Sequence, residues 1–491
     1  MKFSPFIKDV SFTFFTSIIV SLSSIYITRL FAQGMGPDEF GAYSLARRVA
    51  FLITTISSFD IGISIARYLG INQSKPGRGV EYFFIATCIA IIGTITVISI
   101  GLLFSNQFSI LIFKSANYEA LFHATLLLVA GLNAYFLIYA YYRGRGKMYV
   151  SNLWQFLLLS VGSVAIAILF TENISATEIT LYMSYLYLIV TPFLFFIIVS
   201  NFKKIKAAGS LFSKTRELII YGGPRIAGGL TYQGFFSLGP LLASYFCNLK
   251  DAGFITISQL IIVMFIETAM GSFAMVVLPR AAQLFAEKRQ EYLEERINNL
   301  FSFIIQTGLF FTIHLVIWSD VIIMGWVGKN YGPAIILTRV ISLAIIPYMC
   351  FTMFKSIIDA VEVKAINTFN LLAALAAALL GAGGLATIGF GILGIAIGMA
   401  FGFFTLGYLT LRYLMKYYPL KLKEINLFKV SMINAIFFIP SYWLHHSPIF
   451  DTMATILPLF LALVFGCVLF LAYLVVLRTL SVPWLNHIFN T

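Results

Sequence analysis

The chain has 491 residues, of which 60% are hydrophobic and 11% are charged, and its formal net charge is +13. Soluble domains carry about 25% charged residues, so this composition argues against a soluble enzyme. The positive charge is spread over many short segments between apolar stretches, which argues against nucleic-acid binding and indicates a membrane protein.

Apolar stretches that are long enough to cross a bilayer recur along the chain. A membrane-spanning helix needs roughly 20 apolar residues, and by that measure we predict an all-α polytopic membrane protein with about fourteen spans. They cover approximately residues 9–33, 42–68, 81–105, 119–142, 149–171, 178–200, 217–247, 252–283, 297–318, 331–356, 364–388, 391–415, 428–446 and 453–478. The first stretch is too long for the apolar region of a signal peptide, so we expect it to remain as the first span.

The lysines and arginines fall mainly on alternate gaps between these stretches. Of the 33, all except Arg29, Arg47, Arg48, Lys114, Arg225, Lys250, Lys329 and Arg339 lie on every second gap or at the termini. Because Lys and Arg near the ends of spans stay on the cytoplasmic side, both termini are predicted to be cytoplasmic. We therefore expect a multi-pass protein of the cytoplasmic (inner) membrane.

Two segments far apart in the chain are alike. Glu39–Arg47, entering span two, aligns with Asp251–Gln259, entering span eight, and Gly41 then matches Gly253. This similarity predicts a duplication of six spans, whose halves insert in the same sense about an axis along the membrane normal. The predicted parts are an N-lobe (1–201), a basic cytoplasmic linker (202–216), a C-lobe (217–416) and two extra spans (417–491).

Span two carries a polar stripe. Ser57, Asp60, Ser64 and Arg67 recur at helical spacing, and on one continuous helix they share a face. Charged groups inside spans usually face a wet cavity or pair with one another. The stripe therefore predicts a cavity wall, and an Asp60–Arg67 pair that only fixes helix packing is the alternative.

Span seven combines a cation with residues that weaken a helix. Arg225 follows Gly222, Gly223 and Pro224, and Gly228 and Gly229 come soon after it. Proline removes a backbone donor, and helix breaks beside charges are where transporters bind their substrates. We expect a pliant hinge with Arg225 in the cavity. The alternative is that Arg225 extends toward the cytoplasmic headgroups.

Other polar residues are candidates for the same cavity. Arg29, Arg47 and Arg48 lie near the outer ends of spans one and two, and Gln259 and Glu267 lie on span eight. Asp60 and Glu267 are the carboxyl groups that would serve if transport is coupled to protons.

Motifs for catalysis, nucleotides and metals are absent from the sequence. It contains no phosphate-binding loop, no nucleophile elbow and no zinc motif, so we expect no enzyme activity, no catalytic residues, no cofactor and no metal. The histidines are scattered except for His445 and His446 at the end of span thirteen. For His123 and His314, hydrogen bonds between helices are favoured over proton relay.

The stretch Arg29–Arg47 resembles the first-loop signature of polysaccharide flippases, and Tyr221–Arg225 is similar to the start of their second lobe. These flippases are the O-antigen branch of the multidrug/oligosaccharidyl-lipid/polysaccharide exporter superfamily. The resemblance implies a two-lobed transporter that moves undecaprenyl-diphosphate-linked oligosaccharide to the outer leaflet. In related flippases of lipid-linked precursors, arginines of the first two spans and a basic residue of span eight line the cavity. Arg29 and Arg47 or Arg48 match the first part, and span eight has no matching cation, where Gln259 and Glu267 stand instead.

The resemblance implies as partners the polyprenyl-linked oligosaccharide, membrane lipid and other glycan-assembly membrane proteins. The spread of the basic charge argues against nucleic acid as a partner, and because nothing in the sequence requires a homo-oligomer we expect a monomer. Two other functions stay open. A drug or metabolite exporter of the same superfamily would favour an acidic cavity for cationic cargo. A membrane polymerase or ligase of glycan assembly would carry a large external loop, which the sequence does not have.

Overall fold

The fold was taken from a computed structural model of the chain. It describes residues 5–59, 61–72, 76–170, 174–202, 211–263, 266–267, 270, 287, 290–361, 364–420, 427–447 and 456–479. Within the helices a few side chains also lie outside the description, those of Gly223, Pro224 and Arg225 among them. Most of the predicted linker 202–216, and Asp60 of the predicted stripe, fall outside the described residues as well.

The described residues form helices joined by short turns, and these residues contain no strand. Eight of the described helical segments, or nine if one bent pair is counted as a span, are long and apolar enough to cross a membrane. Two of these segments, Ser11–Ser57 and Ile366–Met415, are 47 and 50 residues long, and each is long enough for two crossings. The prediction of an all-α, multi-pass membrane protein is confirmed.

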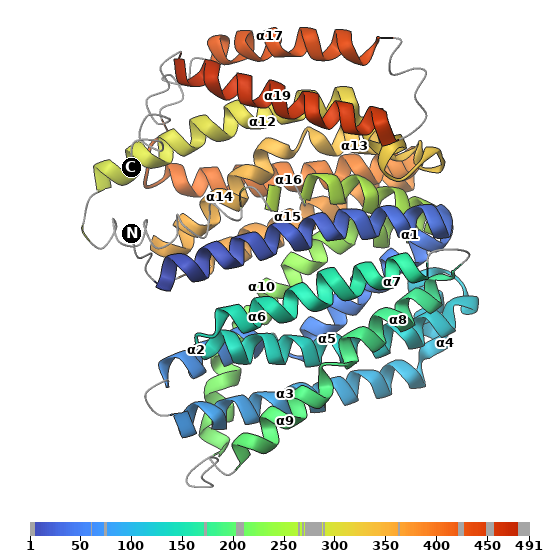
Figure 1. The fold of residues 1–491 in the computed structure, drawn as a ribbon, viewed down its shortest axis with the longest axis vertical. Helices are drawn as coiled ribbons and strands as arrows, with labels where there is room; N and C mark the ends of the chain where they lie inside the picture. Colours follow the sequence, from blue (N-terminus) through green and yellow to red (C-terminus); the bar gives the residue numbers. More distant parts are fainter. Residues whose placement is uncertain are drawn as a thin grey trace. The chain divides into compact units, whose positions relative to one another are not determined.

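The chain divides into two compact units, Met1–Thr256 and Ile257–Thr491. In the first unit, α5 is the central helix, and α1, α2, α3 and α8 pack against it (Figure 1). The elements of this unit are α1 (Pro5–Ser57), α2 (Ile61–Ile71), α3 (Pro76–Leu103), α4 (Ser105–Phe113), η1 (Ala116–Tyr118), α5 (Glu119–Gly144), α6 (Met148–Gln155), η2 (Phe156–Gly162), α7 (Ser163–Leu169), α8 (Ala176–Leu188), α9 (Thr191–Phe202) and α10 (Leu211–Phe246).

In the second unit, α12 packs against both α17 and α19, and Figure 1 shows the three helices side by side. An aromatic core of Phe310, Phe437 and Tyr473 joins them. The elements of this unit are α12 (Gln290–Trp326), η3 (Lys329–Tyr331), α13 (Ala334–Ser342), α14 (Ile345–Val361), α15 (Ile366–Leu385), η4 (Ala386–Phe390), α16 (Gly391–Met415), α17 (Leu427–His445) and α19 (Ile456–Thr479).

Glycines mark two of the breaks that the sequence predicts between spans. In α1, Gly36 has φ 74° and ψ 173°, outside the helical region, immediately before Pro37. Gly389 and Gly391, with φ 96° and 52°, separate α15 from α16. A side chain disfavours positive φ, whereas glycine adopts it readily. Spans one and two, and spans eleven and twelve, are therefore divided close to the predicted positions.

The predicted continuity of span two is wrong. α1 ends at Ser57 and α2 begins at Ile61, and Phe59 between them has φ 53°. The 100° rotation per residue that placed Ser57, Ser64 and Arg67 on one face applies only within an unbroken helix. These residues belong to two helices, so the angular argument for a single polar stripe does not hold.

The two aligned glycines of the predicted duplication contact each other within the first unit. A Cβ atom on Gly41 would overlap the carbonyl oxygen of Leu249, and one on Gly253 would lie 2.9 Å from the carbonyl oxygen of Pro37. Leu249 follows Pro37 by the same number of residues as Gly253 follows Gly41, so the contact is reciprocal. The compact units divide at 256/257, and α10 thus groups with the first unit, whereas the predicted C-lobe begins at 217. The division into an N-lobe and a C-lobe of six spans each therefore stays a prediction.

This close approach predicts that Gly41→Ala destabilises the protein by about 1–3 kcal/mol, the usual cost of overpacking. We expect a lower midpoint of thermal unfolding in detergent, with a smaller decrease for Gly253→Ala. Gly383→Ala in α15 is the matched control, because a Cβ atom there would meet no atom within 4 Å. Equal midpoints for Gly41→Ala and Gly383→Ala would contradict the prediction.

Candidate functional site

The first unit contains a cavity of about 100 Å³ that is lined by α1, α5, α8 and the η2–α7 segment. Arg47 is the one charged residue among the described residues that line it, and Tyr43, Tyr187, Ser24 and Ser163 supply hydroxyl groups. The remaining lining is apolar, mostly Leu and Ile. A guanidinium with several hydroxyl groups in an otherwise apolar cavity is suited to an anionic, hydroxylated ligand.

Tyr43 and Arg47 lie one helical turn apart on α1, so both side chains reach the same side of the helix. Tyr43 is buried and packs edge-to-face on Phe31, with ring centroids 5.3 Å apart. The guanidinium carbon of Arg47 lies 5.8 Å from the centroid of the Phe51 ring. The sequence predicted Arg47 as a cavity residue. It did not single out Tyr43 and Tyr187, because the chain has 25 tyrosines and nothing in the sequence distinguishes these two.

The other two predicted arginines of this region have different positions. Arg48 donates from Nη1 to the backbone carbonyl of Phe236 at 2.5 Å, and it thereby connects α1 to α10. Arg29 is half-buried in α1 and is not among the residues that line the cavity. Of the three, the structure brings only Arg47 to the cavity.

At the α1–α2 break, Ser57 is hydrogen-bonded to α5. The buried amide of Asn133 on α5 donates to Ser57 at 2.8 Å and to Thr94 at 2.7 Å. Ser64 is fully buried, and among the described residues its hydroxyl has no hydrogen-bond partner, while Arg67 is exposed. Ser57 therefore takes part in a packing contact between α1 and α5, and its role in a cavity stays a prediction.

The predicted hinge of span seven lies inside α10, which is one helix from Leu211 to Phe246. A Cβ atom on Gly222 would lie 3.1 Å from the hydroxyl of Ser64, so this glycine allows α10 to approach α2 closely. Gly228 and Gly229 also lie within α10. The hinge, and the cavity role of Arg225, remain predictions because the side chain of Arg225 is outside the description.

The start of α10 is fastened to α3 by two polar contacts. Lys214 pairs with Glu81, both side chains being nearly buried, and Tyr82 donates its hydroxyl to the carboxylate of Glu217. Tyr68 of α2 stacks on Tyr82, with ring centroids 4.5 Å apart. From the sequence, Lys214 was interpreted only as one of the cytoplasmic basic residues. Its partner Glu81 is 133 residues away, so no pattern near Lys214 indicates the pair.

In the second unit, the two predicted residues of span eight differ in their surroundings. Gln259 is buried, and neither polar atom of its side chain has a hydrogen-bond partner among the described residues. Glu267 accepts from the hydroxyl of Tyr348 and lies 3.9 Å from the Nζ atom of Lys355. The resemblance implied a cation on span eight, where this chain has none. Among the described residues, the cation beside Glu267 is Lys355, and it belongs to α14.

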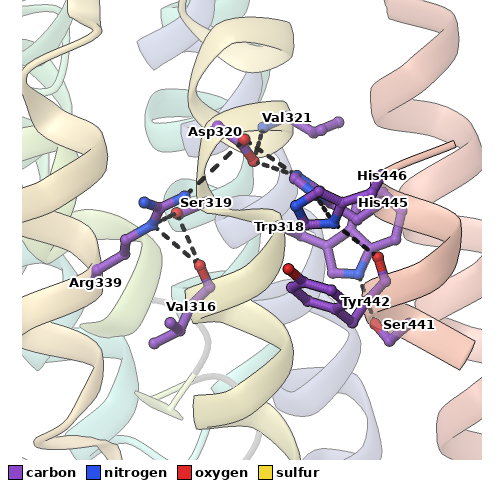
Figure 2. A network of polar contacts seen from close by, with 10 residues as sticks. All are labelled: Val316, Trp318, Ser319, Asp320, Val321, Arg339, Ser441, Tyr442, His445 and His446. Carbon is purple, nitrogen blue, oxygen red and sulfur yellow. Dashed lines mark hydrogen bonds and ion pairs between the residues drawn. The ribbon is translucent and has the colours of Figure 1, made fainter. Parts of the chain in front are cut away.

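A second polar cluster in this unit joins three helices (Figure 2). Asp320 of α12 lies between His445 of α17 and Arg339 of α13. Trp318 of α12 donates its indole N–H to Ser441 of α17 at 2.8 Å. The sequence analysis identified the adjacent His445 and His446, but no sequence pattern indicated Asp320 as the partner of His445.

The described residues contain no group of His, Cys, Asp or Glu side chains that could hold a metal ion. No protein-family model matches the chain, and no curated protein sequence matches it.

The fold is that of a class of multi-pass membrane transporters. The structure is similar to the lipid II flippase MurJ in an inward closed conformation, with a TM-score of 0.72 and 13% identity over 96% of this chain and 99% of that chain. It is also similar to a multidrug resistance MATE family transporter of the MOP superfamily in an inward-facing conformation, with a TM-score of 0.66 and 12% identity over 82% and 97% of the two chains. For the Vibrio cholerae MATE transporter VcmN in the bent form, the TM-score is 0.56 and the identity 14%, over 86% and 98%.

The ion pair between Glu267 and Lys355 predicts a measurable energetic coupling. In a double-mutant cycle with Glu267→Gln and Lys355→Met, we expect a coupling energy of roughly 0.5–3 kcal/mol, since both side chains are less than one-third exposed. The free energy of unfolding in detergent is the measured quantity.

The matched control is the pair Glu119 and His123 on α5, which has the same 3.9 Å separation but is more exposed. Solvent screens exposed pairs, so a cycle with Glu119→Gln and His123→Gln should give a smaller coupling. A larger coupling for the exposed pair would show that burial does not decide the strength of these contacts.

Proposed function

We propose that this protein is a flippase that moves a polyprenyl-diphosphate-linked oligosaccharide, such as an O-antigen or other surface-polysaccharide repeat unit, from the cytoplasmic to the outer leaflet of the inner membrane. The observation that carries the proposal is the position of Arg47 in an otherwise uncharged cavity, within a fold similar to that of a lipid II flippase. The proposed protein is a transporter and not an enzyme, with both termini in the cytoplasm.

A diphosphate suits this cavity because its oxygens accept paired hydrogen bonds from a planar guanidinium. The hydroxyl groups of Tyr43 and Tyr187 add donors beside Arg47. Aromatic rings also offer apolar faces to the faces of sugar rings. The cavity of about 100 Å³ is small for a complete oligosaccharide, so we assign it to the diphosphate and the first sugar.

The lipid tail can stay outside this cavity. A separate, open apolar groove of about 600 Å³ is also formed by α1 with the η2–α7 segment, and Leu22, Tyr26, Val161 and Ile168 are among the residues that line it. A hydrogen bond between Ser23 and Ser160 joins α1 to η2 at this groove. A polyprenyl chain lying there would keep its apolar surface in lipid while the diphosphate enters the protein.

Transport by alternating access requires contacts that open and close. The pair Lys214–Glu81 and the contact Tyr82–Glu217 hold the start of α10 on α3. By the predicted topology they lie at the cytoplasmic end, so they would have to separate when the substrate enters from that side. Gly222, Gly223, Pro224, Gly228 and Gly229 are the proposed positions at which α10 bends.

A drug or metabolite exporter is the second candidate, because the fold is shared with MATE family transporters. Many cationic drugs would be repelled by Arg47, which has no acidic neighbour among the residues that line the cavity. A polymerase or ligase of glycan assembly is the least favoured function, since the sequence lacks a large loop between spans.

The proposal predicts that Arg47→Ala lowers translocation of a lipid-linked oligosaccharide in proteoliposomes about tenfold to a hundredfold. Loss of a hydrogen bond to a charged group costs about 1.5–3 kcal/mol, and each 1.36 kcal/mol is a factor of ten in rate. Arg47→Lys should restore only part of the rate, because an ammonium lacks the planar fork.

Arg143→Ala is the matched control. Arg143 is exposed in the last turn of α5 and bonds to Tyr139 on the same helix. Its replacement should leave the rate within about twofold of the wild-type value. A wild-type protein that exports small cations and does not translocate the lipid would exclude the flippase.

Arg225 gives an independent test of the predicted cavity. If its side chain contacts the diphosphate, Arg225→Ala abolishes translocation at normal expression and Arg225→Lys rescues little, for the geometric reason given for Arg47. If it extends to the headgroups instead, both variants translocate as the wild type does. Arg216→Ala, at an exposed position of the same helix, controls for a general loss of basic charge.

A further inference from the structure

His445 and His446 lie at the end of α17, and their hydrogen bonds define where their protons are. The Nε2 atom of His445 lies 2.9 and 3.1 Å from the two carboxylate oxygens of Asp320. An ionised carboxylate only accepts hydrogen bonds, so Nε2 carries a proton and donates it. The Nδ1 atom of His446 lies 2.9 Å from the backbone carbonyl of Tyr442, so this nitrogen is a donor as well.

Two imidazole nitrogens of this cluster are left as acceptors, Nε2 of the exposed His446 and Nδ1 of the more buried His445. The Nδ1 atom of His445 lies 3.4 Å from the Nδ1 atom of His446 (Figure 2). Since Nδ1 of His446 is a donor, Nδ1 of His445 holds a lone pair and its imidazole is neutral. This lone pair can take up one proton, after which both nitrogens of His445 would be donors.

Uptake of that proton changes the contacts on both sides of His445. Toward Asp320, the hydrogen bond to the carboxylate becomes an ion pair between two charged groups. Toward His446, two N–H groups would face each other, so the His446 ring has to turn or move its own proton to Nε2 and release the carbonyl of Tyr442. The cluster therefore has two distinct hydrogen-bond arrangements that differ by one proton.

Asp320, which would be the counter-ion of a protonated His445, is itself held by Arg339 and by a backbone N–H group. Arg339 lies 4.0 Å from Asp320 and is itself fixed by Ser319 at 2.8 Å and the carbonyl of Val316 at 3.2 Å. Asp320 also accepts the backbone N–H of Val321. From α19, Phe465 packs on Trp318, and its side chain is uncharged.

We propose that His445 and Asp320 form a proton-binding site that couples the docking of α17 on α12 to protonation. The side chain of His445 is 14% exposed, whereas His446 is exposed and exchanges the proton with water. Histidine is the side chain that changes its charge between about pH 5 and 8. On the predicted topology, this end of α17 faces outward.

Trp318 reports directly on the charge of His445. The two rings pack edge-to-face, with centroids 5.2 Å apart and an interplanar angle of 86°. A cationic imidazole in contact with an indole alters its fluorescence through the ring charge distribution. The experiment is a pH titration of tryptophan emission from the full-length purified protein in nanodiscs, with the Trp318→Phe signal subtracted to remove the other tryptophans.

We expect one reversible transition in this difference signal between about pH 5 and 8. His445→Gln should abolish it. His123→Gln is the matched control, since His123 lies exposed on α5 and its loss should leave the transition unchanged. A flat wild-type signal, or a transition that persists in His445→Gln, overturns the proposal.

The consequence for transport rests on the proposed function and is tested separately. Translocation of a lipid-linked oligosaccharide is measured in proteoliposomes with and without a pH gradient. A wild-type rate that rises with the gradient, and a His445→Gln rate that does not respond, support coupling through this site. An unchanged response in His445→Gln overturns the coupling. Wild-type protein that shows the fluorescence transition but translocates no lipid overturns the proposed function and leaves the proton site standing.

Discussion

Polar groups that lack water must find partners inside the protein, and this constraint organises both units of the chain. Glu81 is paired with Lys214, Glu267 with Lys355, and the guanidinium of Arg48 with a backbone carbonyl. Each contact joins helices that are distant in the sequence. Arg47 differs from these residues because it lines a cavity. A charge placed where a ligand can reach it, among charges that serve packing, is the most specific indication of function in the structure.

Part of this arrangement could be predicted from the sequence, because hydropathy and the alternation of basic residues act over each span separately. They predicted the helical membrane fold, and the break at Gly36 followed from the polar segment around it. The partners of Glu267 could not be predicted, since Tyr348 and Lys355 come from α14. The choice between Arg47 and Arg48 was also beyond reach: adjacent residues point about 100° apart on a helix, and only the packed neighbours show which one faces a cavity.

The error in span two has a physical cause. The pattern Ser57, Ser64 and Arg67 was interpreted on a regular helix, but the chain turns at Phe59, which adopts a left-handed conformation without being glycine. Such conformations are uncommon outside glycine, so neither composition nor periodicity indicates one. Next to this turn, Ser57 accepts a hydrogen bond from Asn133 of α5, a contact that the sequence pattern did not indicate. Polar residues near a break therefore need their tertiary neighbours before a role is assigned to them.

The contact between Gly41 and Gly253 has a consequence for the history of the chain. Gly41 approaches the carbonyl of Leu249, and Gly253 approaches the carbonyl of Pro37. Leu249 follows Pro37 by the same number of residues as Gly253 follows Gly41. Reciprocal contact of this kind is the defining property of an isologous interface, in which one surface patch meets a copy of itself. On the proposed duplication, a half-length ancestor would have formed this contact as a homodimer. Fusion of its two genes would then have turned an interface between subunits into an internal one, in which each glycine is constrained by the other.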